Sequence, residues 1–363
     1  MSKKNSVSVV KNILLAVSGL FSSIILISPE VSPETFWICA LLTFLIFPVV
    51  VAHTFLVPLL VYKKSWYAFV SVVILLMGLF YLSRVYVISF GASKDQQNEA
   101  ALDVLSYNTS FFRAGRVFSK EYYSPEYHLQ ALNTRNWILG QSPDIICLQE
   151  FFDDVNSNIF DNVKFFEQQG KYEAYFMAKP LHNNGTRRGI ITFSRFPIIN
   201  HKEIFLAENR YNGAICTDLL IGTDTIRIIN VHLASLNLFS QKNLSDLLTD
   251  IKKNILLKAK QCNIVLEEIR SSPYRVIVCG DFNEMPLSYT YTKLNEIMNN
   301  AFEEAGGGLG GTLSGKKFFP YLRIDHQFVN PDIKVKEFKT YHNISFSDHY
   351  PIRGSYQVTT GKE

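Results

Sequence analysis

The sequence lacks the clustered cysteines and histidines of a zinc site or a disulfide framework. Its 363 residues include five cysteines and eight histidines, with no CxxC pair and no HExxH segment. The cysteines stand singly, and Cys147 and Cys279 lie inside apolar runs. This spacing predicts buried thiols and excludes a cysteine-held metal, while the redox compartment stays open.

Most of the chain also lacks an excess of basic residues. The formal net charge of +4 comes from the first 94 residues, where seven Lys and Arg accompany two Glu, which leaves 29 basic and 30 acidic residues in the remainder. A protein that holds nucleic acid by its backbone usually presents a basic surface. The near-neutral remainder therefore disfavours tight duplex binding.

Three segments near the N-terminus contain no acid, lysine or arginine: residues 12–28, 36–62 and 66–83. Each is near the ~20 residues that span a bilayer. We predict a membrane anchor of three transmembrane helices over residues 1–90, then a polar linker at 91–100. The first segment could instead be a secretory signal, although no small-x-small cleavage site follows it and two further apolar segments come at once.

Basic residues set the predicted orientation of the anchor. Lysines precede the first apolar segment, and Lys63 and Lys64 separate the second from the third. The positive-inside rule assigns both positions to the cytoplasmic side. We therefore predict a multi-pass protein of the cell membrane whose residues 101–363 are extracytoplasmic, either periplasmic or extracellular.

Beyond residue 100, short apolar strands alternate with helical patterns, and two strands often follow each other directly. Helices are predicted at 124–140, 152–169, 240–270 and 288–298. The pattern indicates an α/β fold of mixed sheets with helices outside. The glycine run at 306–311 lacks GxxxxGK[ST] and no clear strand leads into it, so we interpret it as a loop rather than a phosphate cradle.

Residues able to bind a metal or move a proton follow several apolar runs. The run at 276–279 stops at Gly280 and delivers Asp281 and Asn283 to the rim of a sheet. An Asx turn is the plain alternative for these two residues. The same pattern recurs at three other places, however, ending at Glu150, at His232 and at Asp348 with His349.

The acidic members of this set indicate a divalent metal. Glu150, Asp281, Asp325 and Asp348 are hard oxygen ligands of the kind that Mg²⁺ or Mn²⁺ prefers. Without a cation, such carboxylates would repel one another when buried together. Considered alone, Asp325 could instead be a salt-bridge partner of Arg323. Considered alone, His232 could instead be a core histidine whose hydrogen bonds are satisfied.

Taken in chain order, these segments resemble the endonuclease/exonuclease/phosphatase superfamily, which is deoxyribonuclease I-like. The resemblance covers residues 100–358, and its GDFN and SDH segments in series are highly specific. One departure is His326, where many members carry Tyr. The apolar segments resemble those of a membrane-bound bacterial branch. The segments that carry the resemblance are Asn108, Glu150 after a strand, VHL at 231–233, GDFN at 280–283, RID at 323–325 and SDHYP at 347–351.

The resemblance implies a four-layer sandwich of two mixed β-sheets flanked by helices, here preceded by the three transmembrane helices, with the site at one edge of the sheets. It also implies roles for individual residues. Glu150 binds the metal with help from Asn108 and Asp348; Asp281 and Asn283 orient or deprotonate the attacking water; His349, held by Asp325, contacts the phosphate; and His232 is a second phosphate contact or the proton donor to the leaving oxygen.

We therefore expect a membrane-anchored, metal-dependent hydrolase that cleaves a phosphodiester or phosphomonoester outside the cytoplasm. Its substrate would be a phospholipid head group, a small phosphoester or a nucleic acid, the last making it an endonuclease or exonuclease. A catalytically silent binding protein would require the loss of a core polar residue, and none is lost. A transport component is disfavoured because the apolar segments carry no internal acid. Diester or monoester, one metal or two, and the oligomeric state stay open.

Overall fold

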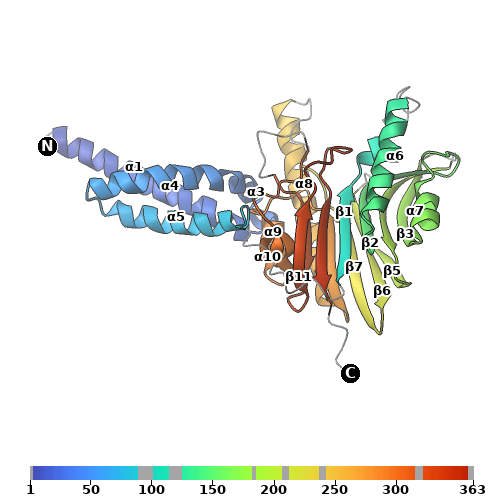
Figure 1. The fold of residues 1–363 in the computed structure, drawn as a ribbon. Helices are drawn as coiled ribbons and strands as arrows, with labels where there is room; N and C mark the ends of the chain where they lie inside the picture. Colours follow the sequence, from blue (N-terminus) through green and yellow to red (C-terminus); the bar gives the residue numbers. More distant parts are fainter. Residues whose placement is uncertain are drawn as a thin grey trace.

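A bundle of apolar helices and a sandwich of two sheets make up the structure (Figure 1). The computed structural model describes residues 3–88, 101–113, 125–181, 185–206, 212–236, 243–314 and 322–358. The linker predicted at 91–100 lies outside the described residues.

The N-terminal bundle buries a narrow apolar seam and exposes much of its remaining apolar surface. Ile25, Val49 and Ile74 pack in the seam, whereas Phe55 and Phe69 are 74% and 75% exposed. Exposed apolar surface on this scale is unfavourable in water and marks a face that contacts lipid or protein. The helices of this part are α1 (Lys3–Ile27), α2 (Pro33–Phe36), α3 (Ile38–Leu42), α4 (Ile46–Tyr62) and α5 (Tyr67–Ser83).

Two helical segments, rather than the three predicted, are long and apolar enough to cross a bilayer. They are Val9–Glu30 with 22 residues and Ile38–Tyr62 with 25. Helix α5 is apolar but has 17 residues. At ~1.5 Å per residue it extends about 26 Å, less than the ~30 Å of a hydrocarbon core. The prediction of three transmembrane helices is therefore corrected to two candidates.

The sandwich consists of two six-stranded mixed sheets, ordered β11-β12-β1-β2-β4-β3 and β5-β6-β7-β8-β10-β9. Strands β1 and β2 pair in parallel, as do β7 and β8, and the other pairs of described strands are antiparallel. The strands are β1 (Leu102–Asn108), β2 (Ile145–Asp154), β3 (Glu173–Leu181), β4 (Thr186–Ser194), β5 (Ile198–Leu206), β6 (Gly213–Ile221), β7 (Asp224–His232), β8 (Arg275–Asp281), β9 (Asn299–Asn300), β10 (Asp325–Val329), β11 (Lys334–Thr340) and β12 (Ile352–Gln357).

Helices cover the outer faces of both sheets. Helices α6 (Pro125–Gly140) and α7 (Asn162–Gly170) pack on the first sheet, and α8 (Leu244–Arg270) and α9 (Tyr289–Asn295) pack on the second. The short α10 (Ala301–Ala305) lies beside β11. The α/β sandwich of two mixed sheets flanked by helices is thus confirmed.

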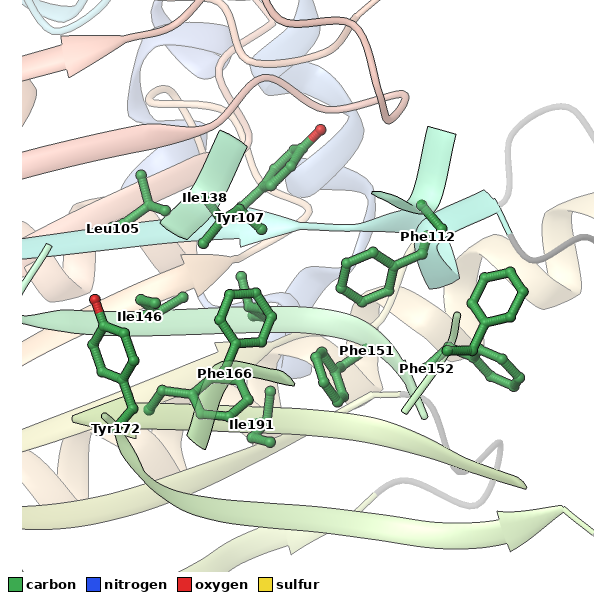
Figure 2. Packing of buried hydrophobic residues seen from close by; sticks show 14 of the residues in the cluster. Leu105, Tyr107, Phe112, Ile138, Ile146, Phe151, Phe152, Phe166, Tyr172 and Ile191 are labelled. Atoms are coloured by element: carbon green, nitrogen blue, oxygen red, sulfur yellow. The ribbon is translucent and has the colours of Figure 1, made fainter. Parts of the chain in front are cut away.

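The central strands carry apolar residues on both faces because both of their faces are covered. In β2, Ile145 and Cys147 face the second sheet, while Ile146 and Leu148 face the helices. Figure 2 shows the aromatic part of the core on the helix side. Because Phe152 continues β2 into this core, the helix predicted from residue 152 begins only at Asn162.

Gly280 allows β8 to approach β7 next to the residues that were predicted to be functional. Its φ is +141°, and a Cβ there would lie 2.0 Å from the carbonyl oxygen of Val231. We expect Gly280→Ala to lower the free energy of unfolding by about 3 kcal/mol or more, because the backbone would have to move. Gly140→Ala is the matched control, since a Cβ there meets nothing within 4 Å. Denaturant unfolding of both variants measures the difference, and equal midpoints would contradict this expectation.

Candidate active site

The predicted site residues meet at one edge of the sandwich, where the parallel strands end. The pairs β1–β2 and β7–β8 bring Asn108, Glu150, His232 and Asp281 to this edge. Strand β10 runs antiparallel to β8 and begins at Asp325, directly opposite Asp281. The carboxyl ends of parallel strands and the start of an antiparallel neighbour share one edge of a sheet. The topology therefore gathers residues that are far apart in the sequence.

The carboxylate of Asp281 is the centre of the site and is 1% exposed. The side-chain amide of Asn108 donates to its Oδ2 at 2.9 Å, and the backbone N–H of Asn283 donates to its Oδ1 at 2.9 Å. Nε2 of His232 lies 3.5 Å from Oδ2, and Nε2 of His349 lies 3.7 Å from it. The carboxylate is thus fixed in orientation and faces two imidazoles.

His349 and Asp325 form a buried pair beside Asp281. Nδ1 of His349 lies 2.8 Å from Oδ2 of Asp325. Burial acts to lower the pKa of His349, but the carboxylates of Asp325 and Asp281 outweigh it and raise this pKa well above its usual value. The imidazole is therefore held in its charged form with Nε2 directed toward Asp281.

Arg323, the alternative partner considered for Asp325, is engaged elsewhere. Its guanidinium donates to Oδ1 of Asn300 at 3.0 Å and to the carbonyl oxygen of Arg84 at 2.7 Å. Among the residues that the structure describes, no ion pair joins Arg323 to Asp325. The geometry thus favours the pairing of Asp325 with His349.

Glu150 reaches the site through an irregularity in β2. The pairing of β2 with β4 shifts register between Leu148 and Phe151, and Glu150 has a φ of +46°. Its side chain is 26% exposed, and its Oε1 lies 3.8 Å from Nε2 of His232. A bulge of this kind re-aims a side chain at a sheet edge. Burial raises the pKa of Glu150.

The remaining two predicted residues differ in placement. Asn283 adopts a left-handed conformation, with φ +50°, and its side-chain amide donates to the carbonyl oxygen of Leu233 at 3.1 Å. It therefore ties the loop after β8 to the end of β7. Asp348 is exposed, and its Oδ1 accepts a hydrogen bond from Ser347 at 3.2 Å. It lies beside the network around Asp281 and takes no part in the hydrogen bonds described for that network.

Lys258 supports the site and was missed from the sequence. It is 1% exposed in α8, and its ammonium donates to the carbonyl oxygen of Asn283 at 2.8 Å and lies 3.1 Å from Oε1 of Glu284. A signal was present, because Lys258 falls in the apolar stripe that includes Ile255 and Cys262. A lysine at a buried helical position indicates a specific partner.

Thr312 also supports the site, and it carries no comparable signal. Its hydroxyl oxygen is buried and accepts from the backbone N–H groups of Ile324 at 3.0 Å and Asp325 at 3.1 Å. It fixes the start of β10, and therefore Asp325. Its position after a glycine run gave no hint of this role.

The carboxylate oxygens of the site fit a divalent cation, whereas the charged imidazole of His349 has no lone pair to offer one. Asp281, Asp325 and His349 are buried, and one ligand atom from each lies within 4.8 Å of the others. Oδ1 of Asp325 is buried without a hydrogen-bond partner among the described residues. Buried carboxylates with an unsatisfied oxygen are stabilised by a nearby positive charge. This group differs from the predicted ligands Glu150, Asn108 and Asp348, although Glu150 lies within reach of the same network.

Comparison with known families identifies the class of protein. Residues 105–349 match the Endonuclease/Exonuclease/phosphatase family, and the chain belongs to this family. Residues 5–85 match a second family, described as a domain of unknown function (DUF8431). None of the curated proteins compared with the chain matches it. Members of the first family's superfamily are hydrolases that act on phosphoester bonds.

Solved structures show the same fold at low sequence identity. An endonuclease/exonuclease/phosphatase from Beutenbergia cavernae is 15% identical, covers 72% of this chain and 72% of its own, and gives a TM-score of 0.53. One from Bacteroides vulgatus is 15% identical over 72% of this chain and 100% of its own, with a TM-score of 0.52. A family protein from Leptotrichia buccalis is 16% identical over 71% and 100%, with a TM-score of 0.50. At these identities the likeness concerns the fold alone.

The pairing of His349 with Asp325 generates a direct test. We expect Asp325→Asn to lower the pKa of His349, because it removes the largest charge that raises this pKa, and to lower kcat by ~10²–10⁴-fold. Asp224→Asn, which breaks an ion pair with Arg275 at the opposite end of β7, is the matched control. NMR titration of the histidines and steady-state hydrolysis measure the two effects. A wild-type kcat in Asp325→Asn would show that the pair has no role in the reaction.

Proposed function

We propose that this chain is a membrane-anchored, metal-dependent phosphoesterase. The observation that carries the proposal is the network around Asp281, in which Asn108 and Asn283 donate to a buried carboxylate that faces His232 and His349. Phosphoryl hydrolysis needs a positioned water, neutralisation of phosphate charge and protonation of the leaving oxygen, and little covalent chemistry. The donors and acceptors of the network suit these needs.

Glu150, with Asn108 and Asp348, is proposed to hold Mg²⁺ or Mn²⁺, for which oxygen ligands are suited. When bound, the cation would neutralise charge on the phosphate oxygens. Asp281 and Asn283 would orient the attacking water, with Asp281 accepting its proton. This role is supported by the two hydrogen bonds that fix the carboxylate.

The two histidines are proposed to act on the phosphate. His349 has a raised pKa next to Asp325 and would donate a hydrogen bond from Nε2 to a phosphate oxygen. His232, between Glu150 at 3.8 Å and Asp281 at 3.5 Å, would contact the phosphate or protonate the leaving oxygen. A silent binding protein has no need of this complete set of groups.

The proposed substrate is a phospholipid head group or another small phosphoester. The apolar bundle supports a site that works close to a bilayer, and the near-neutral composition after residue 94 disfavours tight duplex binding. Hydrolysis of extracytoplasmic nucleic acid is the alternative. Assays of the purified protein with sphingomyelin, inositol phosphates, a simple diester, DNA and RNA separate these substrates.

We further propose that residues 1–90 anchor the chain, 91–100 form a linker, and 101–363 form a catalytic domain outside the cytoplasm. The orientation is supported by the N-terminus of α1 and the Lys63–Lys64 turn, which lie at the end of the bundle away from the sandwich (Figure 1). The positive-inside rule assigns this lysine-bearing end to the cytoplasm. The proposed orientation therefore requires the 17-residue α5 to cross the bilayer together with the two longer candidates, because two crossings alone would return the chain to the cytoplasm.

Chelation tests the metal requirement. We expect a chelator to abolish hydrolysis of a simple phosphodiester and added Mg²⁺ or Mn²⁺ to restore it. Glu150→Gln should raise the metal concentration needed for half-maximal rate, because one charged ligand is lost. The exposed Glu167→Gln on α7 is the control variant. Undiminished turnover in chelator would overturn the proposed function.

Reporter fusions test the orientation. An enzyme reporter that is active only outside the cytoplasm should be active when fused after residue 363 and silent when placed between Lys63 and Lys64. Activity of both fusions is read in intact cells, with protein amounts equalised by immunoblot. The reverse pattern would place the sandwich in the cytoplasm and refute the proposed localisation.

A further inference from the structure

The helical bundle docks directly on the sandwich, on the side of α9 and α10 (Figure 1). Val87 and Gly308 exchange two backbone hydrogen bonds, of 3.0 and 2.9 Å. The guanidinium of Arg84, the residue that follows α5, donates to the hydroxyl of Thr292 in α9 at 3.0 Å. Leu287 packs into the core of the bundle. The junction is therefore specific and includes backbone, polar and apolar contacts.

Arg323 lies between the two parts. It is 1% exposed, and one terminal nitrogen donates to the carbonyl oxygen of Arg84 at 2.7 Å while the other donates to Oδ1 of Asn300 at 3.0 Å. Its guanidinium also stacks 4.3 Å from the centre of the Phe302 ring. A buried arginine whose donors are divided in this way holds the end of α5 against the sandwich.

From Arg323 a hydrogen-bonded path leads to the loop after β8. Nη1 of Arg323 lies 3.2 Å from Nδ1 of His326. A guanidinium can only donate, so Nδ1 accepts and the proton of His326 is on Nε2. That nitrogen donates to the carbonyl oxygen of Glu284 at 2.7 Å. Glu284 follows Asn283 directly, so the loop after β8, which carries Asn283, is held from the side of the anchor.

The charge state of His326 agrees with this path. Burial and the charge of Arg323 lower the pKa of His326 well below its usual value. The imidazole is therefore neutral and can accept and donate at the same time. Lys258 of α8 also holds this loop, through the carbonyl oxygen of Asn283.

A second path runs through the glycine run at 306–311. Gly308, with φ +72°, is the residue paired with Val87. The run leads to Thr312, whose hydroxyl accepts from the N–H of Asp325 and whose carbonyl oxygen accepts from the N–H of Tyr350 at 2.6 Å. These contacts fix both members of the Asp325–His349 pair. Two paths thus connect the end of α5 with the site.

We propose that the segment 84–87 is part of the support of the active site, and that Arg323 is a positioning residue through which docking of the bundle sets the geometry of the loop after β8. This proposal rests on the proposed function for its effect on rate. Misplacement of reacting groups by ~1 Å costs ~10²-fold in rate. The anchor thereby acts as an activator of hydrolysis, in addition to tethering the enzyme.

The structural part is tested by hydrogen–deuterium exchange of the full chain in detergent micelles. Val87→Pro removes the N–H that bonds to Gly308, whereas Val87→Ala keeps it. We expect faster exchange at residues 282–284 in Val87→Pro and wild-type exchange there in Val87→Ala. This measurement needs no substrate, and unchanged exchange at 282–284 in Val87→Pro would overturn the proposed coupling.

The kinetic part compares two buried arginines in the full chain. Arg323→Lys loses the divided hydrogen bonds, and Arg227→Lys is the matched control, since Arg227 is buried in ion pairs with Asp218 and Glu268. With bis(p-nitrophenyl) phosphate and Mg²⁺, we expect kcat to fall ~10–10²-fold in Arg323→Lys with KM little changed. Arg227→Lys should keep kcat per folded molecule within about twofold.

The two ways of failing are distinguishable. If the wild-type chain shows no metal-dependent hydrolysis of any substrate offered, the proposed function falls, and the exchange experiment still decides whether the anchor and the loop are coupled. If the wild-type chain is active and Arg323→Lys keeps its kcat, the positioning role of Arg323 is wrong while the phosphoesterase assignment stands.

Discussion

A carboxylate as deeply buried as that of Asp281 needs hydrogen-bond donors and positive charge around it. These come from separate parts of the chain: the amide of Asn108 at the end of β1, the N–H of Asn283 after β8, and the imidazoles of His232 and His349. Strand β1 belongs to one sheet and β8 to the other. The site therefore exists only while the two sheets keep their alignment.

Polar contacts inside the sandwich maintain that alignment. Gln149 of β2 donates to Asn230 of β7 at 2.7 Å, and Gln327 of β10 donates to the carbonyl oxygen of Val104 in β1 at 3.1 Å. All of these groups are buried in an otherwise apolar layer, where an unmatched amide is costly. A slip of one sheet over the other would leave such groups unpaired. The contact partner Gln149 immediately precedes Glu150, so this alignment also positions the site.

The ends of β7 and β8 could be predicted from the sequence because each combines an apolar run with a polar stop, at His232 and at Asp281. The sequence predicted the helix from residue 152 wrongly because Phe152 suits a helix and a strand equally, and only the aromatic core decides. The contact between Arg84 and Arg323 joins residues 239 positions apart, and no local pattern encodes it. Sequence periodicity thus predicts which residues are buried. Contacts between residues far apart in the chain can be identified only once the topology is known.

The five free thiols, all buried, have a consequence for the chemistry the chain can tolerate. Burial raises the pKa of Cys216 and of Cys262 to about 12, so almost none of either is thiolate at neutral pH. Since the thiolate is the species that reacts with oxidants and disulfides, these two thiols react slowly in the folded chain. A thiol reagent would therefore report on unfolding rather than on the native surface.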